Sequence, residues 1–145
     1  MYFLIPLMYL MGLGKGVFLV QYFCIYVDGL FIRLKASNID CYIGQASAGA
    51  LGYADDITLL TLSVFLLRQM LDICSQYAFE FSISFNASKS NCIVFRHSGD
   101  EIDINRYNFY ISDQRIEIVK QWSHLGNIID NSLQDKDCIY SEGII

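Results

Sequence analysis

In Leu51–Leu60, LGYADDITLL, two adjacent carboxylates interrupt an apolar run. The flanking segments LGY and ITLL are rich in residues that favour strands. Successive side chains of a straight strand point to opposite faces, so Asp55 and Asp56 could not share a ligand there. At a tight turn, which accepts Asp, their side chains converge. We therefore expect a β-hairpin with Ala54, Asp55 and Asp56 at or near its bend.

Two carboxylates held this close repel each other, and one is pushed toward protonation unless a cation lies between them. A hard divalent cation with oxygen ligands removes the conflict, and Mg²⁺ is the common choice where phosphates are handled. Asp55 and Asp56 are therefore candidate metal ligands. The alternative is a solvent-exposed Asp-Asp turn that binds nothing.

Composition indicates one folded domain or a piece of one. The chain has 145 residues, of which 54% are hydrophobic and 17% charged, with a mean hydropathy of +0.35. This is too apolar for a disordered chain. The net charge of −5 gives no general attraction to a phosphate backbone, so nucleic-acid binding needs separate support.

The cysteine pattern argues against a zinc site and against a disulfide framework. There are five cysteines (24, 41, 74, 92 and 138), and no two form a C-x-x-C pair. Cys24, Cys74 and Cys92 lie in apolar stretches, which predicts buried thiols. This usage fits a reducing intracellular compartment, cytoplasm or nucleus.

The N-terminal residues are strongly apolar up to Asp28, except for Lys15. A membrane span needs about 20 apolar residues. Each of the two apolar runs is too short, and joining them would place Lys15 in mid-membrane at high cost. We expect a core helix of a larger domain here. The alternative is a small membrane-anchored protein that uses residues 1–27.

Periodicity predicts two helices. The first covers residues 17–35, and a loop with a short strand near 41–44 follows it. The second runs over 63–81, with Ser63 as its N-cap. Its apolar face recurs at three- and four-residue spacing and consists of Leu67, Met70, Leu71, Cys74, Tyr77, Ala78 and Phe81.

The C-terminal half reads as turns and strands. We expect a turn at 86–90, a strand at 91–95, a hairpin over 107–119 around Asp113 and Gln114, and a last short strand at 124–130. Without regular strand–helix alternation, the order of elements favours an α+β fold with an antiparallel sheet.

The segments GALGYADDITLLTLS (49–63) and FNASKSNCIVF (85–95), separated by a helix, resemble the reverse transcriptases of non-LTR (LINE-type) retrotransposons. Residues 23–34 look like the end of the family's preceding helix, and 116–130 like its primer-grip region. The resemblance spans Gly16–Asp130. It implies a partial reverse-transcriptase palm, in which an antiparallel sheet carries the YADD hairpin and two helices pack on it.

The resemblance also implies an activity, RNA-directed DNA polymerisation, with an RNA template, a DNA primer and a dNTP as partners. Asp55 and Asp56 match the aspartates that bind the two catalytic Mg²⁺ ions, and Tyr53 would lie near the primer end. Asn86 and Lys89 match an Asn-x-x-Lys segment, whose lysine lies near the nucleotide phosphates. Lys89 could equally be an ordinary turn lysine.

In the segment that looks like the primer grip, His124, Leu125 and Gly126 form the centre of the match. His124 and Gly126 would then contact the primer strand. The alternatives are a packed, hydrogen-bonded histidine at 124 and a glycine that marks a β-bulge at 126.

The chain departs from the family's pattern upstream of the hairpin. The family's other catalytic carboxylate has no counterpart, because nothing before Asp28 is acidic, and Leu19 and Val20 stand where Ser-Pro is expected. Two-metal catalysis needs ligands that bridge both ions. We therefore expect residues 1–130 to be a truncated palm without fingers or the first aspartate strand, with a polar tail at 131–145. We expect it to be inactive alone. A rival is a remnant that binds nothing specific.

Overall fold

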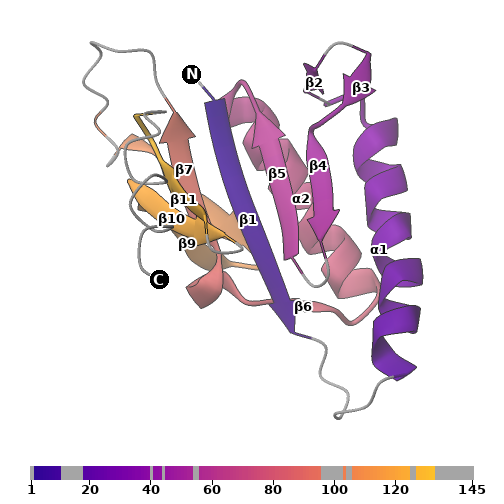
Figure 1. Ribbon diagram of the computed structural model, residues 1–145. Coiled ribbons are helices and arrows are strands. Elements are labelled where there is room, and N and C mark those ends of the chain that lie inside the picture. Colours follow the sequence, from indigo (N-terminus) through magenta and orange to yellow (C-terminus); the bar gives the residue numbers. More distant parts are fainter. Residues whose placement is uncertain are drawn as a thin grey trace, which may run out of the picture.

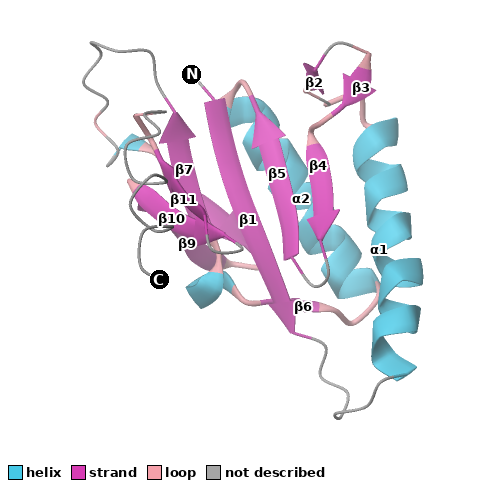
Figure 2. Cartoon of the chain, viewed as in Figure 1, coloured by secondary structure: helices cyan, strands magenta, loops and turns pink. Residues whose placement is uncertain are grey.

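The computed structural model describes residues 2–10, 18–39, 41–43, 45–53, 56–95, 103, 106–124 and 127–132. Two helices cover one face of a sheet, so the fold is α+β as predicted (Figures 1 and 2). The helices are α1 (Phe18–Ala36) and α2 (Val64–Glu80). The strands are β1 (Tyr2–Leu10), β2 (Tyr42–Ile43), β3 (Ala46–Ser47), β4 (Ala50–Tyr53), β5 (Asp56–Thr61), β6 (Ser84–Phe85), β7 (Asn91–Phe95), β8 (Phe109–Ile111), β9 (Gln114–Val119), β10 (Gln121–His124) and β11 (Asn127–Asp130).

The main sheet has the order β4-β5-β1-β7-β9-β8, with β6 paired to β1. Its pairs are antiparallel except β7 and β9, which are parallel. The expectation of a purely antiparallel sheet is therefore wrong at this position. The physical reason is that β8 and β9 form a hairpin whose second strand, not its first, lies against β7.

The N-terminal residues form a strand, which corrects the expected core helix. β1 is central, pairing with β5 over Phe3–Met8. Pro6 lacks the N–H that a helix interior needs and disfavours a helix here. On its other edge β1 pairs with β7 only over residues 2–4 and with β6 only over residues 9–10. Among the described residues, Pro6 thus has a strand neighbour on one side only, a position that tolerates proline.

No helix in the described part of the chain is both long enough and apolar enough to cross a membrane.

Both predicted helices are confirmed within one or two residues. Ser63 caps α2, because its side-chain oxygen accepts a hydrogen bond from the backbone N–H of Phe65 at 3.2 Å. The predicted apolar face is buried with one exception. Phe81 lies just past the helix as its C-cap and is partly exposed. The chain leaves the core at the end of α2, so the three- and four-residue spacing of apolar residues no longer predicts burial at Phe81.

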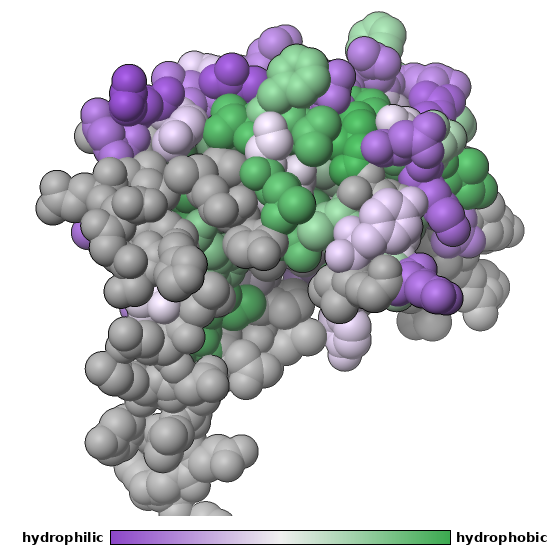
Figure 3. All heavy atoms as spheres, turned by 90° about the horizontal axis from the view of Figure 1, so that it is seen from above, coloured by the Kyte–Doolittle hydropathy of each residue, from purple (hydrophilic) through white to green (hydrophobic). Residues whose placement is uncertain are grey.

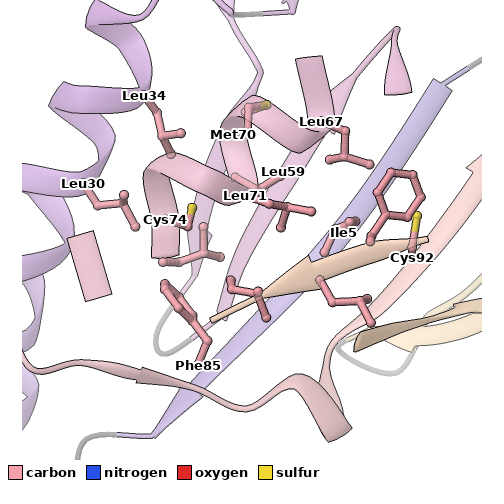
Figure 4. Close-up of a cluster of buried hydrophobic side chains, with 14 of the residues drawn as sticks. Ile5, Leu30, Leu34, Leu59, Leu67, Met70, Leu71, Cys74, Phe85 and Cys92 are labelled. Atoms are coloured by element: carbon pink, nitrogen blue, oxygen red, sulfur yellow. The ribbon is translucent and has the colours of Figure 1, made fainter. Parts of the chain in front are cut away.

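The core lies between the helices and the sheet (Figure 4), and it draws side chains from α1, α2, β1, β5 and β7. Cys74 and Cys92 are buried free thiols, as predicted, and burial raises the pKa of each to about 12. Cys41 is also a free thiol. The side chain of Cys24 lies outside the described part of the chain, as does all of Cys138.

The C-terminal half holds one more hairpin than expected. The turn at 86–90 contains a short 3₁₀ helix, Ala87–Lys89, and the strand at 91–95 is confirmed as β7. The hairpin β8–β9 is confirmed, but its turn is at Ser112 and Asp113, one residue before the predicted position, and Gln114 begins β9. The predicted single strand at 124–130 is wrong. Its first residue ends β10, and β11 returns antiparallel to it with His124 opposite Asn127. Leu125 and Gly126, between the two strands, lie outside the described part of the chain, so the alternatives for Gly126 stay predictions.

A hydrophobic patch occupies one end of the molecule. Seen from above, hydrophobic side chains gather in the middle of this end, with hydrophilic ones along the upper and right-hand edges of the view (Figure 3). Leu62 and Phe65, which are exposed, lie where β5 ends and α2 begins (Figure 1). The connection between β4 and β5 is at the opposite end, so the patch is separate from the candidate site.

Candidate catalytic hairpin

The hairpin predicted from LGYADDITLL is present in its two strands. β4 and β5 are antiparallel, and Tyr53 lies directly opposite Asp56. Residues 54 and 55, which connect them, lie outside the described part of the chain. The structure therefore supports the tight connection, while the predicted convergence of the Asp55 and Asp56 side chains stays a prediction.

Asp56 lies on the face of the sheet that the helices leave open. Along β5, Ile57, Leu59 and Thr61 are buried, whereas the alternate residues are only half-buried. Alternate residues of a strand share one face. The buried set packs into the core beneath α1 and α2, so Asp56 belongs to the opposite face (Figure 1).

β4 presents its side chains to solvent. Leu51 is 53% exposed and Tyr53 is 60% exposed. Gly52, between them, faces α1, because a Cβ atom at this position would meet the ring of Phe31. Tyr53 therefore stands beside Asp56 on the open face, since directly opposed residues of an antiparallel pair share a face.

The neighbouring strand offers Asp56 no carboxylate partner. Met8 of β1 pairs with Asp56, and the sequence of β1, YFLIPLMYL, contains no acidic residue. In the described part of the chain no group of three or more His, Cys, Asp or Glu residues is placed to hold a metal ion. The described ligand set is thus one carboxylate, to which Asp55 would add a second.

The segment that holds Asn86 and Lys89 approaches the same end of β1. Phe85 of β6 pairs with Tyr9, which follows Met8 in the strand opposite Asp56. We call β4–β5, with Asp55 and Asp56 at its connection, the acidic hairpin. β1 therefore lies between the acidic hairpin and the start of the Asn-x-x-Lys segment. Two segments far apart in the sequence are brought together by a strand that the sequence analysis expected to be a helix.

Asn86 shapes the turn that carries Lys89. Its backbone carbonyl accepts hydrogen bonds from the N–H of Lys89 (3.1 Å) and the hydroxyl of Ser90 (2.8 Å), and its side-chain oxygen accepts one from the hydroxyl of Ser88 (2.6 Å). Lys89 is exposed. Sequence analysis missed the two serines. Their short spacing from Asn86 is the pattern of local side-chain hydrogen bonds in turns.

Of the two candidate primer-contact residues, only His124 has a described backbone. It ends β10 in a separate two-stranded sheet, and its side chain and Gly126 lie outside the described part of the chain. β10 contacts β7 of the main sheet. Their predicted roles are not decided by the geometry.

Comparison of the chain with protein-family models, curated proteins and solved structures found no match.

Proposed function

We propose that this chain is a palm-type segment of a reverse transcriptase related to those of non-LTR retrotransposons. The observation that carries the proposal is the hairpin β4–β5. It holds Y-A-D-D at its connection, with Asp56 on the helix-free face and Tyr53 opposite. The order of hairpin, amphipathic helix and Asn-x-x-Lys turn, which prompted the resemblance, supports it further.

In the proposed reaction the 3′-hydroxyl of a DNA primer loses its proton to solvent and attacks the α-phosphate of a dNTP on an RNA template. The bond between the α-phosphorus and the bridging oxygen breaks, and pyrophosphate leaves. Mg²⁺ would stabilise the charge on the attacking and leaving oxygens. Asp55 and Asp56 would hold the metal, and Lys89 would contact a phosphate. Residues 124–126 would contact the primer.

We further propose that residues 1–145 alone do not polymerise DNA. Two-metal catalysis requires carboxylates that reach both ions. The strand beside Asp56 contributes Met8 at the opposed position and no acidic residue along its length. Asp55 and Asp56 would then form an incomplete cage with weak affinity for a cation.

Primer extension by the purified chain tests the proposed inactivity. With an RNA template, a DNA primer, dNTPs and Mg²⁺, we expect no product. Metal-dependent extension that disappears in Asp55→Asn would overturn the proposed inactivity.

A gain-of-function variant tests the geometry. Met8→Asp places a third carboxylate opposite Asp56, so we expect it to bind Mn²⁺ more tightly than the unmodified chain. Leu4→Asp, opposite Leu60 at the other end of the same pairing, is the charge-matched control. Equal Mn²⁺ affinity in the two variants would contradict the proposed site.

A further inference from the structure

The two strands of the acidic hairpin are held in different ways. β5 lies between β4 and β1 and is hydrogen-bonded on both sides. β4 stands at the end of the sheet order, and β5 is its partner among the described strands. The sheet alone therefore fixes β4 along one edge, and contacts from the face must fix the rest of its position.

One such contact joins β4 to α1. An ideal Cβ atom built at Gly52 would lie 2.8 Å from Cζ and 2.9 Å from Cε2 of Phe31. Distances this short do not occur for real Cβ atoms, so the ring occupies the space that any other residue at position 52 would need. Glycine inside a strand often marks such a close approach.

The helix that carries Phe31 is itself well anchored. Leu30 and Leu34 are buried in the core.

α1 also contacts α2 directly. Arg33 forms an ion pair with Glu80 of α2, with Nη1 and Oε2 2.7 Å apart, and its guanidinium lies over the ring of Tyr77, 4.9 Å from the centroid. Gly29 lies against the hydroxyl of Tyr77. These contacts hold α1 in place, and Phe31 of α1 contacts the edge strand β4.

We infer that Phe31 is a positioning residue for the acidic hairpin, acting through Gly52. Gly52 adjoins Tyr53, which lies opposite Asp56. A displacement of β4 at Gly52 therefore moves Tyr53 relative to Asp56, while β5 stays fixed by β1. The inference rests on the proposed function in one respect, since the position of the hairpin affects cation binding only if Asp55 and Asp56 bind a cation.

The test uses the full chain, ¹⁵N-labelled, with amide chemical shifts and Mn²⁺-induced line broadening as readouts. In Gly52→Ala the new methyl group displaces either the ring or the strand, so the amide signals of Tyr53 and Asp56 shift while those of β8 do not. Mn²⁺ affinity falls about tenfold, the loss typical when a group that orients metal ligands is disturbed. Adding Phe31→Leu, which shortens the side chain at the contact, restores both readouts.

Leu51→Ala is the matched control. It truncates the neighbouring residue of β4, whose exposed side chain faces away from α1, so it leaves the Asp56 signal and Mn²⁺ affinity unchanged. In the opposite direction, Phe31→Ala removes the support. The N–H groups of Leu51 and Tyr53 point toward β5, and we expect them to exchange hydrogen faster than in the unmodified chain. This variant provides the test if Gly52→Ala does not fold.

Unmoved Tyr53 and Asp56 signals in a folded Gly52→Ala variant, or no rescue by Phe31→Leu, would overturn the inference. If Gly52→Ala does not fold, unchanged hydrogen exchange in Phe31→Ala would overturn it. Absence of Mn²⁺ broadening in the unmodified chain is a different failure. It would refute the proposed metal site, while the amide shifts and the exchange rates would still decide whether Phe31 positions the hairpin.

Discussion

Two hairpins form the opposite edges of the main sheet, and they are held very differently. β8–β9 closes one edge with Phe109 and Ile111 fully buried, and α2 packs against β8. β4–β5 forms the other edge, where Leu51 and Tyr53 are more than half exposed. Both hairpins place two residues between their paired strand ends, so the connection length is not the difference.

The turn of β8–β9 is also tied to the core. Ser112 and Asp113 both have positive φ angles, 46° and 64°, as a two-residue type I′ turn requires. The N–H of Ser112 donates to the hydroxyl oxygen of Ser75 at 2.9 Å, and that hydroxyl donates to the carbonyl of Leu71 at 2.8 Å. One hairpin is therefore part of the core, whereas the edge strand of the other is free to present its side chains to a ligand.

The largest expected effect is loss of stability in the buried hairpin β8–β9. Phe109→Ala removes a fully buried ring and is expected to lower the free energy of unfolding by about 3–5 kcal/mol. Leu51→Ala, at the exposed edge, should change it by less than about 0.5 kcal/mol. Urea unfolding measures both. Equal losses would show that the two edges contribute equally to stability, against the comparison above.

A smaller effect, in the stabilising direction, is expected in β5. Thr61 is buried, and its hydroxyl has no hydrogen-bond partner among the described residues. A buried hydroxyl without a partner costs free energy, so Thr61→Val, which has nearly the same shape, should stabilise the chain by about 1 kcal/mol. Thr58→Val, on the other face of the same strand, is the control and should have little effect. A destabilised Thr61→Val variant would mean that the hydroxyl is satisfied.

The smallest effect concerns the ion pair that anchors α1, the helix that carries Phe31. The hydrogen bond from Arg33 holds the pKa of the Glu80 carboxyl below its ordinary value of 4.5. A carboxyl with a lower pKa in the folded state adds stability above its unfolded pKa and loses it as the pH falls through the folded pKa. Both side chains are substantially exposed, so solvent screens the pair.

Glu80→Gln should therefore lower the melting temperature slightly at pH 7. The difference from the unmodified chain should begin to shrink as the pH falls below about 4.5, and it should vanish below the lower pKa that Glu80 has in the folded state. Asp72→Asn removes one carboxylate from the same helix and is the control. A difference that persists unchanged at pH 3 would show that Glu80 acts by packing and not by charge.

Local patterns predicted the elements whose signals are local. α2 was readable because its buried residues recur at helical spacing and Ser63 satisfies a free backbone N–H. The β8–β9 hairpin and the strands flanking the two aspartates followed from β-prone runs around turn residues. For the candidate site, the sequence predicted the residue types and their order along the chain. The face that Asp56 occupies and the contact between Gly52 and Phe31 were not, since both depend on α1.

Short-range spacing and side-chain chemistry were enough to predict the two helices, the strands of the acidic hairpin, the turn at Asn86 and the burial of Cys74 and Cys92. Three features depend on long-range contacts instead: residues 2–10 form the central strand, β9 runs parallel to β7, and Met8 lies opposite Asp56. An apolar run such as YFLIPLMYL satisfies a helix or a strand equally well by hydrophobicity. β1 pairs with β5 on one side and with β7 on the other, and these backbone hydrogen bonds form only if residues 2–10 are a strand.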